Sequence, residues 1–171
     1  MTVASSLLVL GGARSGKSGY AQGRAEALEG NLVFVATAQA FDEEMADRIA
    51  LHRADRGPRW TTAEAPVDLA SIIDRHSQPH NVLLIDCLTL WTSNLLLADQ
   101  DIIVATELLV SATTRAPGPL IFVANEVGLG IVPDNPLARR FRDEAGRVNQ
   151  AIAAAVDEVT FVAAGLPLRL K

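Results

Sequence analysis

Short, continuous apolar runs recur along the chain, separated by stretches with helical character. Continuous runs are typical of strands that are buried on both faces of a parallel sheet covered by helices. They predict strands at residues 3–10, 32–37, 82–86, 120–124 and 159–164, with a short edge strand at 168–170. The intervening segments predict helices over about 17–28, 42–55, 66–76, 102–113 and 137–156.

The alternation of strands and helices predicts an α/β fold with an open, mostly parallel sheet flanked by helices. No repeat, low-complexity tract or linker divides the 171 residues, so we expect residues 1–171 to form a single domain. Two segments rich in Gly, Pro and polar residues, 56–66 and 125–136, predict loops. Ligands of open α/β sheets bind beyond the carboxyl ends of the strands, where such loops lie.

The segment Gly11–Ser18 reads GGARSGKS and fits the pattern G-x-x-x-x-G-K-[ST] between a predicted strand and a predicted helix. Its glycines let backbone N–H groups and the positive helix end face a phosphate. Lys17 is expected to reach the β- and γ-phosphates, and Ser18 to place its hydroxyl on Mg²⁺. A glycine-rich turn with a chance GKS is the alternative, but the strand–loop–helix context favours nucleotide binding. The predicted phosphate-binding positions are Gly11, Gly12, Ala13, Arg14, Ser15, Gly16, Lys17 and Ser18.

Asp86 ends the apolar run at 82–86. A carboxylate at the tip of a buried strand is the usual second partner of the Mg²⁺ shell in P-loop proteins. The alternative is a capping residue for the segment that follows, and the phosphate loop favours the metal role.

His52 shares one face of the predicted helix at 42–55 with Met45 and Ile49. It is either a histidine at the edge of the core or a nucleophile, and the residues alone leave both interpretations open. A neutral imidazole beside a nucleotide can attack the α-phosphorus, expel pyrophosphate and form a nucleotidyl-histidine. The surrounding arginines suit a polyphosphate or, equally, a solvated helix face paired with acidic residues; they are Arg48, Arg53, Arg56 and Arg59.

The composition excludes several classes of protein. The net charge of −5 argues against a general nucleic-acid or anionic-membrane surface. Cys87 is the only cysteine, so the chain cannot build an internal disulfide or a cysteine-based zinc site. The apolar runs are shorter than the roughly 20 residues that span a bilayer. We therefore expect a cytoplasmic protein with no membrane span and no nucleic-acid partner.

Beyond the phosphate loop, several motifs together resemble the bifunctional adenosylcobinamide kinase / adenosylcobinamide-phosphate guanylyltransferase family of cobalamin biosynthesis. The resemblance covers nearly the whole chain, although Gly57 separates Arg56 from Pro58 where the family usually has an Arg-Pro pair. The motifs that carry it are ATA at 36–38, the stretch 48–56, WTTAEAP at 60–66, DCLTLWTSNLL at 86–96, NEVGLGIVP at 125–133, FRD at 141–143, GRVN at 146–149 and AGLPL at 164–168.

The resemblance implies a RecA-like P-loop NTPase fold and a homotrimer. It implies that ATP or GTP phosphorylates adenosylcobinamide, and that GMP passes from GTP to adenosylcobinamide phosphate to give adenosylcobinamide-GDP and pyrophosphate. By the same resemblance His52 carries the GMP. The further nucleotide-binding positions that it implies are Ala36, Thr37, Ala38, Arg53, Ala54, Asp55, Arg56, Glu64 and Asp86.

Two alternative functions differ from this prediction. A P-loop GTP- or ATP-binding switch is disfavoured, because such GTPases usually read guanine with an Asn-Lys-x-Asp segment. The corresponding region here is Asn125-Glu-Val-Gly, without the lysine or the aspartate. A single-function small-molecule kinase is the second alternative, and it would form no GMP–protein adduct.

Overall fold

The computed structural model describes residues 6–39 and 56–171. The predicted helix at 42–55 lies outside the described residues. Four predicted site residues lie there with it: His52, Arg53, Ala54 and Asp55.

A seven-stranded sheet forms the centre of the structure, with strand order β3-β2-β4-β5-β1-β6-β7. Every neighbouring pair is parallel except β6 and β7, which are antiparallel. The predicted α/β fold with a mostly parallel sheet is therefore confirmed. The strands are β1 (Ser6–Gly11), β2 (Asn31–Ala36), β3 (Trp60–Glu64), β4 (Asn81–Asp86), β5 (Leu120–Asn125), β6 (Glu158–Ala163) and β7 (Leu166–Arg169).

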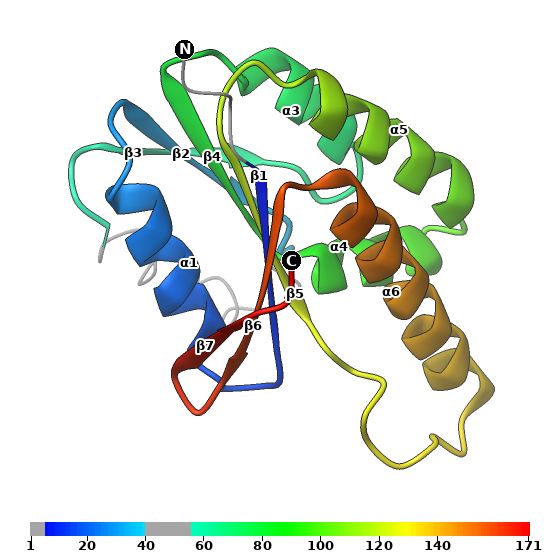
Figure 1. The fold of residues 1–171 in the computed structure, drawn as a ribbon. Helices are drawn as coiled ribbons and strands as arrows, with labels where there is room; N and C mark the ends of the chain where they lie inside the picture. Colours follow the sequence, from blue (N-terminus) through cyan, green and yellow to red (C-terminus); the bar gives the residue numbers. More distant parts are fainter. Residues whose placement is uncertain (1–5, 40–55) are drawn as a thin grey trace.

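Helices cover both faces of the sheet (Figure 1). The helix α1 packs on one face, and the other labelled helices pack on the opposite face. Parallel strands need such crossovers, and the helices bury strands that are apolar on both sides. The helices are α1 (Lys17–Glu26), α3 (Leu69–His76), α4 (Leu88–Leu97), α5 (Ile102–Arg115) and α6 (Pro136–Ala155).

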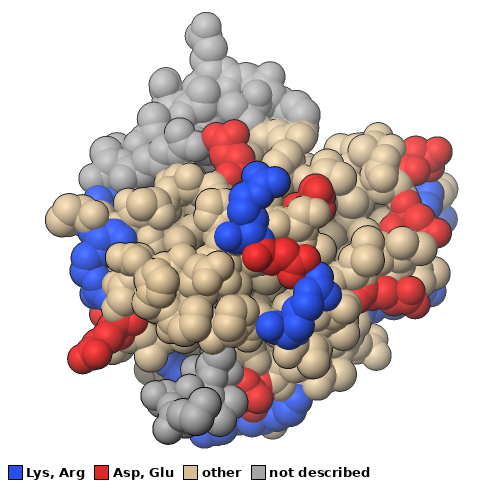
Figure 2. Space-filling view, turned by 90° about the horizontal axis from the view of Figure 1, so that it is seen from above, with Lys and Arg blue, Asp and Glu red and all other residues tan. Residues whose placement is uncertain are grey.

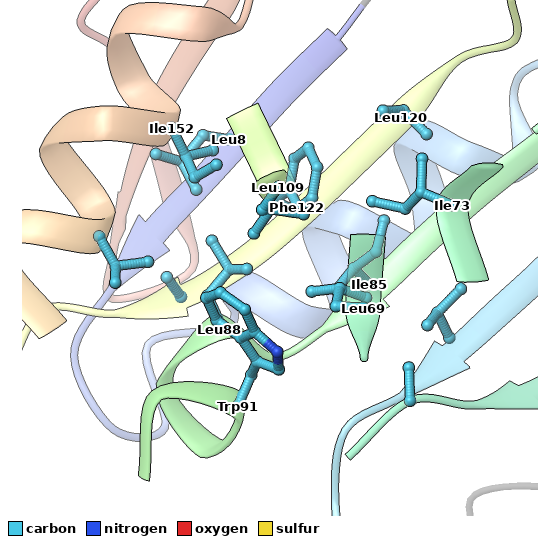
Figure 3. Close-up of a cluster of buried hydrophobic side chains, with 14 of the residues drawn as sticks. Leu8, Leu69, Ile73, Ile85, Leu88, Trp91, Leu109, Leu120, Phe122 and Ile152 are labelled. Carbon is cyan, nitrogen blue, oxygen red and sulfur yellow. The ribbon is translucent and has the colours of Figure 1, made fainter. Parts of the chain in front are cut away.

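The larger hydrophobic cluster lies between the sheet and the helices α3 to α6 (Figure 3). Leu8, Ile85 and Phe122 enter it from three different strands and are fully buried. Trp91 of α4 is also buried, and its indole N–H donates to the carbonyl of Val67 at 2.7 Å. This hydrogen bond satisfies the polar atom of the largest buried side chain.

Two elements differ from the sequence prediction. The segment 56–66 was predicted to be a loop, but Trp60–Glu64 forms the edge strand β3. This strand lies at the margin of the sheet and is partly exposed, so it lacks the apolar run that marks a buried strand. The helix α4 was not predicted because it is apolar around most of its circumference and begins after Cys87, which is a poor N-cap.

Other boundaries shift by a few residues. The helix α3 begins at Leu69, not at Pro66, because Asp68 accepts a hydrogen bond from the N–H of Ser71 as the N-cap. The edge strand predicted at 168–170 is β7, at Leu166–Arg169.

Charged side chains of both signs are interspersed on the face shown in Figure 2. None of the helices in the described ranges has the length and apolar character that a bilayer-crossing helix requires.

Candidate functional site

The predicted site residues lie where the parallel strands end, at the carboxyl-terminal end of the sheet. Ala36 pairs in register with Glu64 on one side and with Asp86 on the other. Gly11 pairs with Asn125 and with Val162. The phosphate loop, Ala36, Glu64 and Asp86 therefore lie at the same edge, which is the lower end of the sheet in Figure 1.

The phosphate loop turns from β1 into α1 through two left-handed residues, Arg14 with φ 55° and Gly16 with φ 92°. Left-handed backbone suits Gly16, whereas it costs energy at a side-chain-bearing residue such as Arg14 and is concentrated at functional sites. The Lys17 side chain folds back into the loop, where its Nζ donates to the carbonyl of Gly12 at 3.0 Å. Lys17 is 8% exposed, so a cation lies within the cradle where a phosphate would sit.

Backbone hydrogen bonds from two neighbouring segments hold the phosphate loop in place. The N–H of Glu126 donates to the carbonyl of Gly11 at 3.0 Å, and the N–H of Gly165 donates to the carbonyl of Ser15 at 2.7 Å. Gly165 lies in the turn between β6 and β7 and approaches Gly16 closely. The residues alone do not predict the role of this turn, because only the family resemblance singles out its motif AGLPL.

Asp86 ends β4, and β5 separates β4 from β1. Two strand spacings put roughly 10 Å between β4 and the phosphate-loop strand, which leaves room for a metal and phosphate oxygens. Ser18 is exposed at the start of α1, and Asp86 is partly exposed. Among the described residues, no group of three or more His, Cys, Asp or Glu is arranged to hold a metal ion. The pair Ser18 and Asp86 fits Mg²⁺, which commonly takes one or two protein ligands beside phosphate oxygens and water.

The predicted ATA segment lies largely inside the protein. Ala36 and Thr37 are buried, and Ala38 is partly buried. The Thr37 hydroxyl accepts a hydrogen bond from the N–H of Cys87 at 2.8 Å and donates to the carbonyl of Cys87 at 2.7 Å. The Thr37 side chain is therefore directed at the segment that follows Asp86.

Two arginines of the predicted cluster contact residues outside the phosphate loop. The Arg56 guanidinium lies 3.3 Å from the ring centroid of Phe34, which is in the middle of β2. Arg59 donates to three carbonyls at the end of α1, those of Glu26 at 3.2 Å, Leu28 at 2.7 Å and Gly30 at 3.0 Å. Arg59 thus serves as a C-terminal cap for α1, and the proposal that Arg56 binds nucleotide stays a prediction.

The Cys87 thiol is predicted to be unreactive in the folded protein. Burial raises the pKa of this thiol, and the nearby Asp86 carboxylate raises it further, so the reactive thiolate is scarce near neutral pH. We expect Ellman's reagent to label the protein only after it is unfolded in urea. Because Cys87 is the only cysteine, one equivalent should then react, and stoichiometric labelling of the native protein would contradict the prediction.

A lysine-bearing glycine loop at the carboxyl edge of a parallel sheet makes this chain a P-loop nucleotide-binding protein. The family described as cobinamide kinase / cobinamide phosphate guanyltransferase matches residues 7–170. The chain belongs to that family.

Curated relatives match over nearly their full length. The "Bifunctional adenosylcobalamin biosynthesis protein CobP" of Pseudomonas aeruginosa is 50% identical over 167 residues, which cover 96% of this chain and 96% of the relative. The "Bifunctional adenosylcobalamin biosynthesis protein CobU" of Salmonella typhimurium is 42% identical, with 96% of this chain and 99% of the relative covered.

Solved structures support the fold alone. The type III secretion ATPase EscN of enteropathogenic Escherichia coli aligns with a TM-score of 0.56 at 11% identity, covering 95% of this chain and 43% of that one. A protein of Pyrococcus horikoshii OT3 aligns with a TM-score of 0.58 at 9% identity, covering 100% of this chain and 88% of that one.

Proposed function

We propose that this protein is a bifunctional enzyme of cobalamin biosynthesis, an adenosylcobinamide kinase and adenosylcobinamide-phosphate guanylyltransferase. The observation that carries the proposal is the family match over residues 7–170, with relatives named as bifunctional adenosylcobalamin biosynthesis proteins. The position of Lys17 in the phosphate loop supports the nucleotide-dependent part of this function.

In the first proposed reaction, a hydroxyl of adenosylcobinamide attacks the γ-phosphorus of ATP or GTP. The bond from this phosphorus to the bridging oxygen breaks, and the hydroxyl proton is released. Lys17 and the loop N–H groups stabilise the charge on the transferred group and on the departing β-phosphate. Ser18 and Asp86 would hold Mg²⁺, which would supply additional positive charge to the phosphate groups.

In the second proposed reaction, the neutral imidazole of His52 attacks the α-phosphorus of GTP. The α–β phosphoanhydride bond breaks, pyrophosphate leaves, and GMP stays on the imidazole nitrogen. An oxygen of adenosylcobinamide phosphate then attacks the same phosphorus, which yields adenosylcobinamide-GDP and restores His52. This role rests on the family resemblance, since His52 lies outside the described residues.

Further parts of the proposal concern the protein as a whole. We infer one catalytic domain over residues 1–171, a cytoplasmic location and a homotrimer. The lack of a dividing linker or repeat supports the single domain, and the single cysteine fits a reducing cytoplasm. The homotrimer rests on the family resemblance. The proposed nucleotide-binding set also keeps Arg53, Ala54, Asp55, Arg56 and Glu64, whose contacts with nucleotide rest on the resemblance.

The decisive test uses GTP labelled at either the α- or the γ-phosphate. Purified protein is incubated with Mg²⁺ and labelled GTP, denatured, and analysed for label on the chain. We expect acid-labile α-label that maps to His52 and that leaves when adenosylcobinamide phosphate is added. The variant His52→Ala should retain no α-label, and His80→Ala should label like the parent because no role is assigned to His80.

Other outcomes identify the alternatives. Phosphorylation of adenosylcobinamide without label on the protein would indicate a single-function kinase. Nucleotide turnover that is independent of adenosylcobinamide, again without label, would indicate a P-loop switch. Full guanylyl transfer by His52→Ala would show that the covalent route is wrong.

A further inference from the structure

The Thr37 hydroxyl donates one hydrogen bond and accepts another within the protein. Thr37 has an exposed fraction of 0%, and its Oγ1 makes both hydrogen bonds to the backbone of Cys87. A hydroxyl has one proton to donate, and here that proton goes to the Cys87 carbonyl. The Thr37 side chain therefore fixes both polar backbone groups of the residue that follows Asp86.

The Asn94 side chain also donates hydrogen bonds to the segments that follow β2 and β3. Asn94 lies on α4 and is 8% exposed. Its amide nitrogen donates to the carbonyl of Thr37 at 2.8 Å and to the carbonyl of Pro66 at 2.9 Å. Both amide protons are thus used to hold the segments that follow β2 and β3 against the helix that begins after Asp86.

The transition from β4 to α4 needs such support. Cys87 is the N-cap of α4, and its sulfur accepts a hydrogen bond from the N–H of Leu90 at 3.5 Å. Thiols are weak acceptors, so this cap does little to fix the direction in which the chain leaves β4. The backbone hydrogen bond from the N–H of Thr37, which follows β2, to the Asp86 carbonyl is long, at 3.4 Å.

We propose that Thr37 and Asn94 are positioning residues that hold the Asp86 carboxylate at one distance from the phosphate loop. Through them the segments that follow β2 and β3 are joined to the start of α4. The backbone immediately after Asp86 therefore cannot shift without breaking buried hydrogen bonds. Errors of about 1 Å in a reacting group can cost roughly 100-fold in rate, which gives such rigidity a function. The inference rests on the proposed role of Asp86 as a Mg²⁺ ligand.

The test measures how strongly Mg²⁺ and nucleotide help each other to bind. A fluorescent ATP analogue is titrated into the protein in EDTA and, separately, in Mg²⁺, and the ratio of the two affinities is the metal coupling. For Thr37→Val we expect the affinity in Mg²⁺ to fall about tenfold further than the affinity in EDTA, so that the coupling drops by the size of one or two lost hydrogen bonds. The conservative variant Thr37→Ser keeps the hydroxyl and should restore the parental coupling, even if its thermal stability falls.

The variant Asn94→Asp provides an independent test. An ionised carboxylate cannot donate to the carbonyls of Thr37 and Pro66, so the coupling should fall in the same direction. This variant decides the question if Thr37→Val does not fold. Equal losses of affinity in EDTA and in Mg²⁺ for the folded variants would overturn the proposal, because the residues would then act on the nucleotide or on stability alone.

The variant Asp86→Asn separates this inference from the proposed function. If Asp86→Asn loses the coupling while folded Thr37→Val and Asn94→Asp keep it, the positioning role is wrong and the metal role stands. If Asp86→Asn keeps the full coupling, the proposed metal role of Asp86 and the positioning role of Thr37 and Asn94 are both wrong. Loss of coupling in all three variants, with rescue by Thr37→Ser, is the result that we expect.

Discussion

Replacing Lys17 by methionine is expected to lower the rates of both proposed reactions by roughly 100-fold or more, the size of effect seen when one preorganised electrostatic group is removed. Methionine has a similar length and no charge. The Lys17 ammonium is held inside the phosphate loop by the Gly12 carbonyl at 3.0 Å, where it would face the phosphates of a bound nucleotide. Initial rates of adenosylcobinamide phosphorylation and of GMP transfer would measure the effect.

Arg140→Met is a suitable control for the Lys17 variant. Arg140 is an exposed cation on α6, and its replacement removes one positive charge without touching the phosphate loop. We expect its activities to match those of the parent. If Lys17→Met lost phosphorylation but still formed the GMP adduct at the parental rate, the GTP used in the transfer reaction would bind without this loop.

Replacing Gly11 by alanine is expected to lower the free energy of unfolding by about 3 kcal/mol, a large value for overpacking. A Cβ at this position would lie 2.5 Å from the Ser15 Oγ and 2.6 Å from the Val162 carbonyl oxygen. Ser15 can rotate away, but the Val162 carbonyl belongs to the neighbouring strand β6. Either β1 and β6 must separate or the loop must move, and both changes should also weaken nucleotide binding. Urea denaturation and nucleotide titration would measure the two effects.

Gly12→Ala is the matched control for this substitution. A Cβ at position 12 would meet nothing within 4 Å, so we expect the free energy of unfolding to change by only about 0.5 kcal/mol. Equal stability losses in the two variants would show that contact with Val162 does not explain the requirement for glycine at position 11.

The phosphate loop was identifiable from the sequence because its function depends on local chemistry. A lysine and a hydroxyl residue at set spacing from two glycines, between a strand and a helix, fit one type of structure, which the described residues confirm. The buried strands were equally visible, since helices on both faces require continuous apolar runs. The nucleophilic role of His52 stays a prediction, because the described residues do not include it.

The edge strand and the apolar helix escaped detection for opposite reasons. β3 is too exposed to show an apolar run, whereas α4 is too buried to show an amphipathic stripe. In both cases the neighbouring elements determine the structure, and the local sequence carries little of that information.

From its residues alone this chain could be assigned a parallel α/β fold, a phosphate loop at Gly11–Ser18 and a candidate metal ligand at Asp86. The strand order, which puts β5 between β1 and β4, emerged only from the tertiary structure. So did the contacts of Thr37 and Asn94, which join residues 50 and 57 positions apart in the sequence. Motifs are visible in a sequence because they are local, whereas long-range hydrogen bonds depend on how the whole sheet assembles.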